Sequence, residues 1–167
     1  MKTIIFAILI VSLWVFPLQA KAEAQLQSVA RNLSVLQPSS SRLIATEQEV
    51  KQFFDKYIER YTSKDIDGFL WLFSLNAVQN QQDGLPGIRE IYSNFFDQTQ
   101  TLHCRFEDRK VEIYDNGVEV KARYEVGQIM KRTGERKILK GRIRWVLIKE
   151  DGILKILSID YKHEKAR

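Results

Sequence analysis

Few residues in this 167-residue sequence have the types and spacing that catalysis or metal binding requires. There are two histidines, His103 and His163, and one cysteine, Cys104. A structural zinc site needs several cysteine or histidine ligands, and a nucleophile needs a base beside it; the sequence shows neither pattern. It also lacks a glycine-rich phosphate loop. We therefore expect no metal, no cofactor and no intramolecular disulfide.

Cations are the more abundant signal. Between residues 101 and 149 there are 13 lysines and arginines but only seven acidic residues, whereas the whole chain has a net charge of +5. Strand residues of one parity share a face of the sheet, so four of these cations should form a basic face. They are Lys121, Arg123, Arg142 and Arg144. Such a face can bind an anionic protein or envelope component, or it can be a solvated surface whose charges oppose aggregation.

The N-terminus has the pattern of an export signal. Lys2 precedes an apolar run over residues 4–16, and Pro17 and several small residues follow. A helix of this length spans about 20 Å, which is short for a hydrocarbon core of about 30 Å. We expect a signal peptide over 1–22 and a periplasmic or secreted protein; an uncleaved anchor or a buried strand is the alternative. In an oxidising compartment an exposed thiol is a liability, so Cys104 should be buried.

The remaining chain divides into a linker, a domain and a tail. Residues 23–45 are expected to be a linker or a loosely docked helix, because a short apolar stripe is followed by a proline and three serines. The domain should span 46–163, and 164–167 should be a tail. A capping box at 46–49 begins the first helix, and apolar residues recur at helical spacing up to about Ser63.

Two more helices and a short strand should follow before the pattern changes. The helices are expected at 66–73 and from near Pro86 to near Gln98, with a strand at 75–79 between them. From Thr101 apolar and polar residues alternate, which indicates strands. Three turn signals divide this region into four strands, and the Asn-Gly pair of the first turn should take positive φ twice.

Helices followed by one curved antiparallel sheet predict an α+β fold. Nine residues should meet between the helices and the sheet. They are Phe53, Tyr57, Phe69, Phe73, Tyr92, Phe96, Tyr124, Trp145 and Ile156.

Three motifs, taken in order, resemble the nuclear transport factor two-like superfamily, which includes SnoaL-like and ketosteroid-isomerase-like proteins. The motifs are D-I-D-G at 65–68, L-F-S-L-N-A-V at 72–78 and G-I-R-E-I-Y at 87–92, and the resemblance covers about residues 46–162. It implies a cone-shaped sheet wrapped around about three N-terminal helices, with a pocket at the open end. The pocket residues that it implies are Tyr57, Tyr61, Asn76, Tyr92, Tyr124 and Trp145.

The resemblance also implies where chemistry would occur. In the steroid-isomerising members a tyrosine on the first helix donates to an enolate oxygen, and this position falls on Tyr57. The proton-moving aspartate falls on Gln81, which cannot accept a proton at neutral pH. Asn76 also stands where an acid is usual, and Asp83 replaces the base only after a register shift of two. His103 could also be a base, but it is out of phase with its apolar neighbours Leu102 and Cys104, and a lone histidine on a strand is usually structural or solvated.

Two functions of different class follow from these residues. The first is an exported, non-catalytic binding or assembly module; the alternative is a small isomerase or lyase that acts on an apolar carbonyl compound in the cone pocket. The vacant base position favours the first. A small apolar ligand fits either function, and nucleic acid is not expected for an exported protein. A weak homodimer is also expected, through Val146 and Ile148 beside the basic face.

Overall fold

The computed structural model describes residues 43–164, so the expected signal peptide and most of the expected linker lie outside the described residues. In chain order the elements are α2 (Glu47–Ser63), α3 (Ile66–Leu70), β1 (Phe73–Gln79), β2 (Asp83–Gly84), α4 (Leu85–Gln98), β3 (Thr99–Ile113), β4 (Val118–Met130), β5 (Arg136–Glu150) and β6 (Ile153–His163). This is the predicted α+β fold. No helix in the described part of the chain has the length and apolar character needed to cross a membrane.

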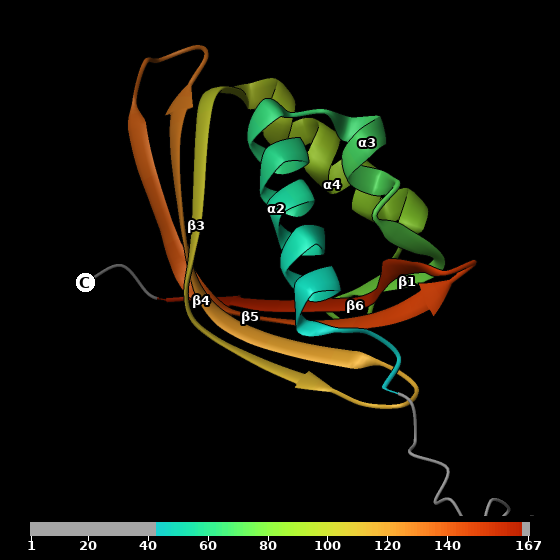
Figure 1. The fold of residues 1–167 in the computed structure, drawn as a ribbon. Helices are drawn as coiled ribbons and strands as arrows, with labels where there is room; N and C mark the ends of the chain where they lie inside the picture. The colour runs from blue at the N-terminus through green and yellow to red at the C-terminus, as the bar shows by residue number, and fades with distance from the viewer. Residues whose placement is uncertain (1–42, 165–167) are drawn as a thin grey trace, which may run out of the picture. The chain divides into compact units, whose positions relative to one another are not determined.

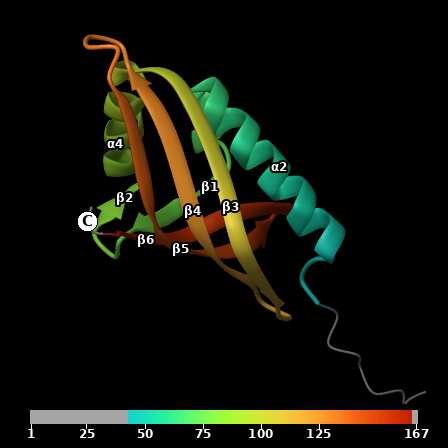
Figure 2. The ribbon, with the colours of Figure 1, turned by 90° about the vertical axis from the view of Figure 1, so that its left-hand side faces the viewer.

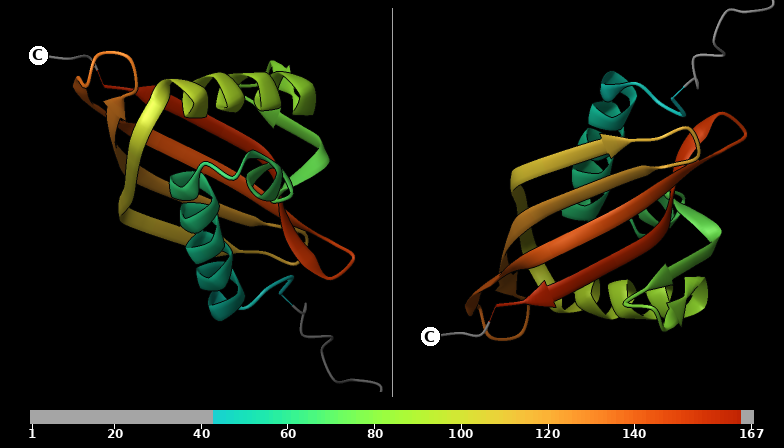
Figure 3. Two further views of the ribbon diagram at one scale, coloured as in Figure 1. Left: turned by 90° about the horizontal axis from the view of Figure 1, so that it is seen from above. Right: turned by 90° about the horizontal axis from the view of Figure 1, so that it is seen from below.

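The six strands form one curved sheet in the order β2-β1-β6-β5-β4-β3. The helices all lie on its concave face, which gives the cone shape (Figure 1). Figure 2 shows the strong bend of β3, β4 and β5, and Figure 3 shows that the described helices leave the outer face of the sheet uncovered. We call these the inner and the outer face.

The start of α2 is fixed to the sheet. Glu49 N donates to Thr46 Oγ1 at 3.2 Å, and the Glu49 carboxylate accepts from Thr46 N at 2.7 Å, which is the predicted capping box. Lys149 of β5 donates to the same carboxylate at 2.7 Å and to the carbonyl of Ile44 at 3.2 Å. Ile44 and the buried Ala45 therefore pack on the domain, although both were expected in the linker.

The second helix is shorter than predicted. It ends at Leu70 rather than Phe73, because the carbonyl of Leu72 accepts from Ile156 N at 2.8 Å and the backbone joins the sheet there. Phe73 is the first residue of β1, which pairs parallel with β6. The sheet is thus mixed rather than purely antiparallel, and the two-residue strand β2 adds an edge that the sequence pattern did not predict.

The turns that connect strands β3 to β6 differ in backbone conformation. Asp151 and Gly152, between β5 and β6, both have positive φ, 49° and 79°, as a two-residue hairpin requires. Between β3 and β4 the prediction of positive φ for Asn116 and Gly117 is wrong. The connection is a four-residue loop, closed by a hydrogen bond from Tyr114 N to Gly117 O at 2.8 Å, so neither residue needs a left-handed conformation.

The core lies between the helices and the inner face, and all nine expected core residues are buried. Trp145 is fully buried, with ring centroids 4.9 Å from both Phe54 of α2 and Phe106 of β3. Its neighbour Arg144 is exposed. The parity predicted for β5 is therefore correct.

Candidate functional site

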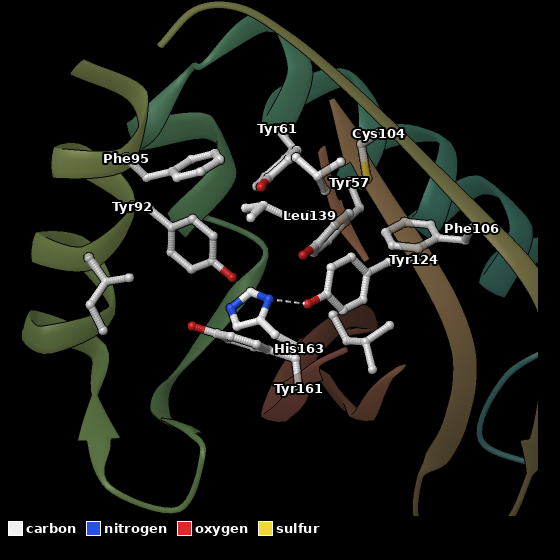
Figure 4. A pocket seen from close by; sticks show the side chains of 13 residues that line it. Tyr57, Tyr61, Tyr92, Phe95, Cys104, Phe106, Tyr124, Leu139, Tyr161 and His163 are labelled. Carbon is white, nitrogen blue, oxygen red and sulfur yellow. Dashed lines mark hydrogen bonds between the residues drawn. The ribbon is translucent and has the colours of Figure 1, made fainter. Parts of the chain in front are cut away.

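A cavity of about 140 Å³ lies on the inner face, between α2, α4 and strands β3 to β6 (Figure 4). Its polar groups are five tyrosines and one histidine, and the other lining residues are apolar apart from Cys104. The polar side chains are Tyr57 and Tyr61 from α2, Tyr92 from α4, Tyr124 from β4, and Tyr161 and His163 from β6. No aspartate, glutamate, lysine or arginine lines the cavity within residues 43–164.

Glycine at position 141 of β5 makes room for one wall of this cavity. A Cβ atom at Gly141 would lie 2.7 Å from the hydroxyl oxygen of Tyr124 and 2.1 Å from the backbone oxygen of Lys162. Real side chains do not approach so closely, so any larger residue would displace the Tyr124 ring. The position of Tyr124 therefore depends on the absence of a side chain on the neighbouring strand.

Tyr124 and His163 form a hydrogen-bonded pair, with 2.6 Å between the hydroxyl oxygen and Nδ1 (Figure 4). Burial, and after it the nearby Tyr161 and Glu164, raise the pKa of Tyr124 to about 12. The hydroxyl is therefore protonated at neutral pH and can donate to Nδ1. His163 itself is exposed and lies at the rim of the cavity.

The deeper tyrosines are neutral hydrogen-bonding groups. Tyr57, Tyr61 and Tyr92 are buried, and burial raises the pKa of each hydroxyl well above its usual value. Figure 4 shows the hydroxyls of Tyr57, Tyr92 and Tyr124 pointing into the cavity. Cys104 is partly rather than fully buried, and burial raises the pKa of its thiol to about 12, so it is not a nucleophile at neutral pH.

Two residues that were expected to line the pocket lie elsewhere. Asn76 is exposed on β1, because the pairing of β1 with β6 shifts register between Phe73 and Val78 and interrupts the alternation of faces. Trp145 is in the core behind the wall of the cavity, with its ring centroid 5.8 Å from that of Tyr57. The other four expected pocket residues do line the cavity.

The candidate bases are not at the cavity. Gln81 lies in the turn after β1, where its φ is 62°, and its side chain is exposed. Asp83 belongs to β2 and is half-buried, but it does not line the cavity either. His103 is exposed on the outer face and does not line the cavity. Among the described residues, His163 is the one imidazole that lines the cavity, and imidazole is the side chain most often used for proton transfer.

The four cations of the expected basic face lie together on the outer face. Lys121 is directly opposite Arg144, and Arg123 is directly opposite Arg142, on the adjacent strands β4 and β5. All four side chains are exposed. The structure thus separates an uncharged cavity on the inner face from a charged surface on the outer one.

No family model and no curated protein matches this chain. Solved structures, however, share its fold. A nuclear transport factor 2-like superfamily protein from Salmonella enterica serovar Typhimurium is 16% identical with a TM-score of 0.63, over 71% of this chain and 91% of the other. The protein Aln2 from a Streptomyces species is 20% identical with a TM-score of 0.60, over 72% and 93%.

An enzyme is also among these neighbours. A type 2 hexachlorocyclohexane dehydrochlorinase is 7% identical with a TM-score of 0.61, over 71% of this chain and 84% of the other. At such identities the likeness shows the fold alone. It confirms the cone fold that the three sequence motifs predicted.

Proposed function

We propose that this chain, which has the cone fold of the nuclear transport factor 2-like superfamily, is an exported, non-catalytic module that binds a small, uncharged, ring-sized ligand in its cavity. One observation supports this most strongly: the described wall of the cavity consists of tyrosines, one histidine and apolar residues, without a carboxylate or a fixed cation. A fold by itself does not determine a function, so the argument depends on this wall.

The size of the cavity indicates the size of the ligand. A buried apolar cavity of about 150 Å³ accommodates one benzene molecule, and the cavity here measures about 140 Å³. Its apolar wall favours a hydrocarbon ring. The hydroxyls of Tyr57 and Tyr92 can donate to a carbonyl or hydroxyl oxygen on that ring.

The absence of a positioned carboxylate favours binding over catalysis. Proton abstraction requires a base within hydrogen-bonding reach of the substrate. Gln81 occupies the expected base position, and neither it nor Asp83 lines the cavity. The Nδ1 atom of His163 is already engaged by Tyr124.

Export is part of the proposal and is supported by the sequence pattern of residues 1–22. Intact-mass measurement of protein recovered from the periplasm should show removal of the N-terminus after Ala20, Ala22 or Ala24. Full-length protein retained in the inner membrane would contradict it.

Ligand binding can be tested with cyclohex-2-enone, a neutral single-ring ketone, by NMR titration of the purified full-length chain. Leu139→Phe should fill the cavity and weaken binding at least about tenfold, because an added ring occupies the space of the ligand. Ile138→Phe is the matched control, since Ile138 is the preceding residue of β5 and is 56% exposed. Equal binding by both variants would place the ligand outside the cavity.

The alternative, an isomerase, is favoured by the Tyr124–His163 pair at the cavity rim. His163 would move a proton while a tyrosine hydroxyl stabilises the enolate oxygen. Cyclohex-3-enone is then the informative substrate, because its isomerisation to cyclohex-2-enone needs only removal of a proton from C2, between the carbonyl and the double bond, and delivery of a proton to C4. Conversion by the wild-type chain that is lost in His163→Gln would establish the enzyme and overturn the non-catalytic proposal.

A further inference from the structure

The outer face carries two adjacent rows of charged side chains that run across the strands. Charges of opposite sign alternate in one row, whereas the other contains three successive cations. The first, which we call the paired row, contains Arg105 of β3, Glu125 of β4 and Lys140 of β5, each directly opposite the next. Its charges alternate in sign. Glu125 accepts from Lys140 at 2.6 Å and from Arg105 at 3.1 Å, so both cations of this row are ion-paired within it.

The second, which we call the cationic row, lies two residues further along the strands. It contains Arg123 of β4, Arg142 of β5 and Lys162 of β6, again directly opposite one another. Glu107 of β3 lies opposite Arg123 at one end of this row, but its carboxylate pairs with Arg105 at 3.3 Å. Within residues 43–164, Arg142 and Lys162 form no ion pair, and Arg123 has only Glu164, at 3.5 Å. Like charges directly opposite on neighbouring strands, which are about 4.8 Å apart, destabilise a sheet. The cationic row therefore has an electrostatic repulsion that the paired row does not have.

More cations adjoin the cationic row on its other side. Lys110 of β3 is opposite Lys121 of β4, which is opposite Arg144 of β5. Lys121 and Arg144 share the carboxylate of Glu119, whereas Lys110 has no ion pair in the described part of the chain. The excess of positive charge is therefore concentrated at Lys110, Arg142 and Lys162.

These side chains border a shallow hollow of about 650 Å³ on the outer face. Six cations line it, from the cationic row and from Lys110, Lys121 and Arg144, against two carboxylates, Asp108 and Asp160. Asp160 lies 3.4 Å from Arg144 and is thus partly neutralised. Ile143 and Tyr161 border both this hollow and the cone cavity, so the two lie back to back across the sheet.

We propose that this hollow is an oxyanion site, centred on Arg142 and completed by Arg123 and Lys162, that binds the phosphate group of a soluble phosphomonoester. Charge complementarity is the argument for this occupant. A carboxylate carries one charge and would neutralise only one member of the row. A phosphate carries about 1.5 to 2 negative charges and three acceptor oxygens, and arginine binds it through two parallel hydrogen bonds.

The test is titration of the full-length chain with inorganic phosphate and with glycerol 2-phosphate, by calorimetry at constant ionic strength. Lys162→Gln and Arg142→Gln should each weaken binding at least about tenfold, since each removes a charge-assisted hydrogen bond. Lys140→Gln is the matched control for Lys162→Gln. It removes the same charge from the same face but lies in the paired row, and it should leave binding within about twofold of wild type.

A stability measurement separates this site from an ordinary structural role. Without phosphate, Arg142→Gln should unfold at the same or a higher temperature than wild type, because it relieves repulsion along the cationic row. Phosphate should raise the unfolding temperature of wild type and of Lys140→Gln but not of Arg142→Gln. An equal rise in all three proteins would show only the general effect of an excluded salt and would overturn the proposal.

Two further probes, an acidic peptide and vesicles, test whether the hollow binds a different anionic partner. A glutamate-rich peptide that binds as tightly as glycerol 2-phosphate would replace the phosphate site with a general acidic-peptide surface. Binding to vesicles that contain phosphatidic acid, without binding to either soluble phosphate, would assign the face to a membrane. No binding to any of these probes at millimolar concentration would leave the row a solvated surface.

Discussion

The two faces of the sheet use the same strands under different constraints. On the inner face, Val118, Val120 and Trp145 are almost completely buried, and the cavity beside them has no fixed charge within the described residues. On the outer face the intervening side chains, such as Lys121 and Arg144, are exposed and charged. Alternation thus separates an apolar surface from an ionic one within a single layer of backbone.

This difference shows what each face can reveal about function. Burial selects residues on the inner face for packing, so a tyrosine there is first a core residue and only then a ligand-binding group. The outer face has no such requirement. A row of like charges there, such as Arg123, Arg142 and Lys162, has an energetic cost without a packing benefit, and this makes it informative.

The largest expected effect concerns the inner face. Trp145→Ala should lower the free energy of unfolding by about 3–5 kcal/mol, because it removes a fully buried ring from the contact between α2 and β3. Arg144→Ala, one residue away on the outer face, should cost less than about 1 kcal/mol, since the Arg144 side chain is 44% exposed and solvent screens its ion pairs. Urea denaturation of both variants makes the measurement. Similar losses would mean that the two faces do not differ as described.

A pair of glycines provides a second comparison. Gly141→Ala should destabilise the protein by about 1–3 kcal/mol, because the new Cβ collides with Tyr124 and with the backbone of Lys162. Gly127→Ala should instead stabilise it by about 0.4–1 kcal/mol, since nothing lies within 4 Å of a Cβ there and alanine reduces the freedom of the unfolded chain.

Thermal unfolding of the two glycine variants should show a lower unfolding temperature for Gly141→Ala and a higher one for Gly127→Ala than for wild type. Gly141→Ala should also perturb the NMR signals of the His163 ring, because the Tyr124 hydroxyl that contacts it must move. A stable Gly141→Ala variant with an unchanged His163 ring would show that the cavity wall does not depend on this glycine.

Much of the fold could be predicted because its signals are local. The helical spacing behind Thr46 and the alternation along β4 and β5 are periodic over many residues, and both were correct. The prediction of where α3 ends was wrong, because the end of this helix depends on a partner that is distant in the sequence. The backbone at Leu72 joins β6 at Ile156, and no local pattern near residue 72 indicates that pairing.

The candidate site was predicted in part for the same reason. Tyr57, Tyr61 and Tyr92 lie on apolar helical stripes, so their inward direction followed from spacing. His163 was missed, because the pairing of β5 with β6 shifts register between Val146 and Leu147. On β6, Ile156 lies before this shift and faces inward. Tyr161 and His163 lie after it and line the cavity, although they are odd-numbered. Strict alternation from Ile156 would have placed His163 on the outer face.

The smallest predicted effect concerns a single ion pair that links α2 to the sheet. The hydrogen bond from Lys149, and after it those from Thr46, lower the pKa of the Glu49 carboxyl from 4.5 to about 2. A carboxyl whose pKa is lowered by folding stabilises the folded state above its unfolded pKa, and this contribution is lost as the pH falls through the folded value. Stability should therefore decrease from about pH 5 down to about pH 2.

Glu49→Gln should flatten this part of the pH dependence of unfolding, because glutamine keeps the size of the side chain but does not titrate. Glu47→Gln is the control on the same helical turn, since Glu47 forms no ion pair among residues 43–164. The change should be modest, because the Glu49 side chain is 41% exposed and solvent screens the pair. Acid-unfolding curves of identical slope in wild type and Glu49→Gln would show that the pair does not attach α2 to β5.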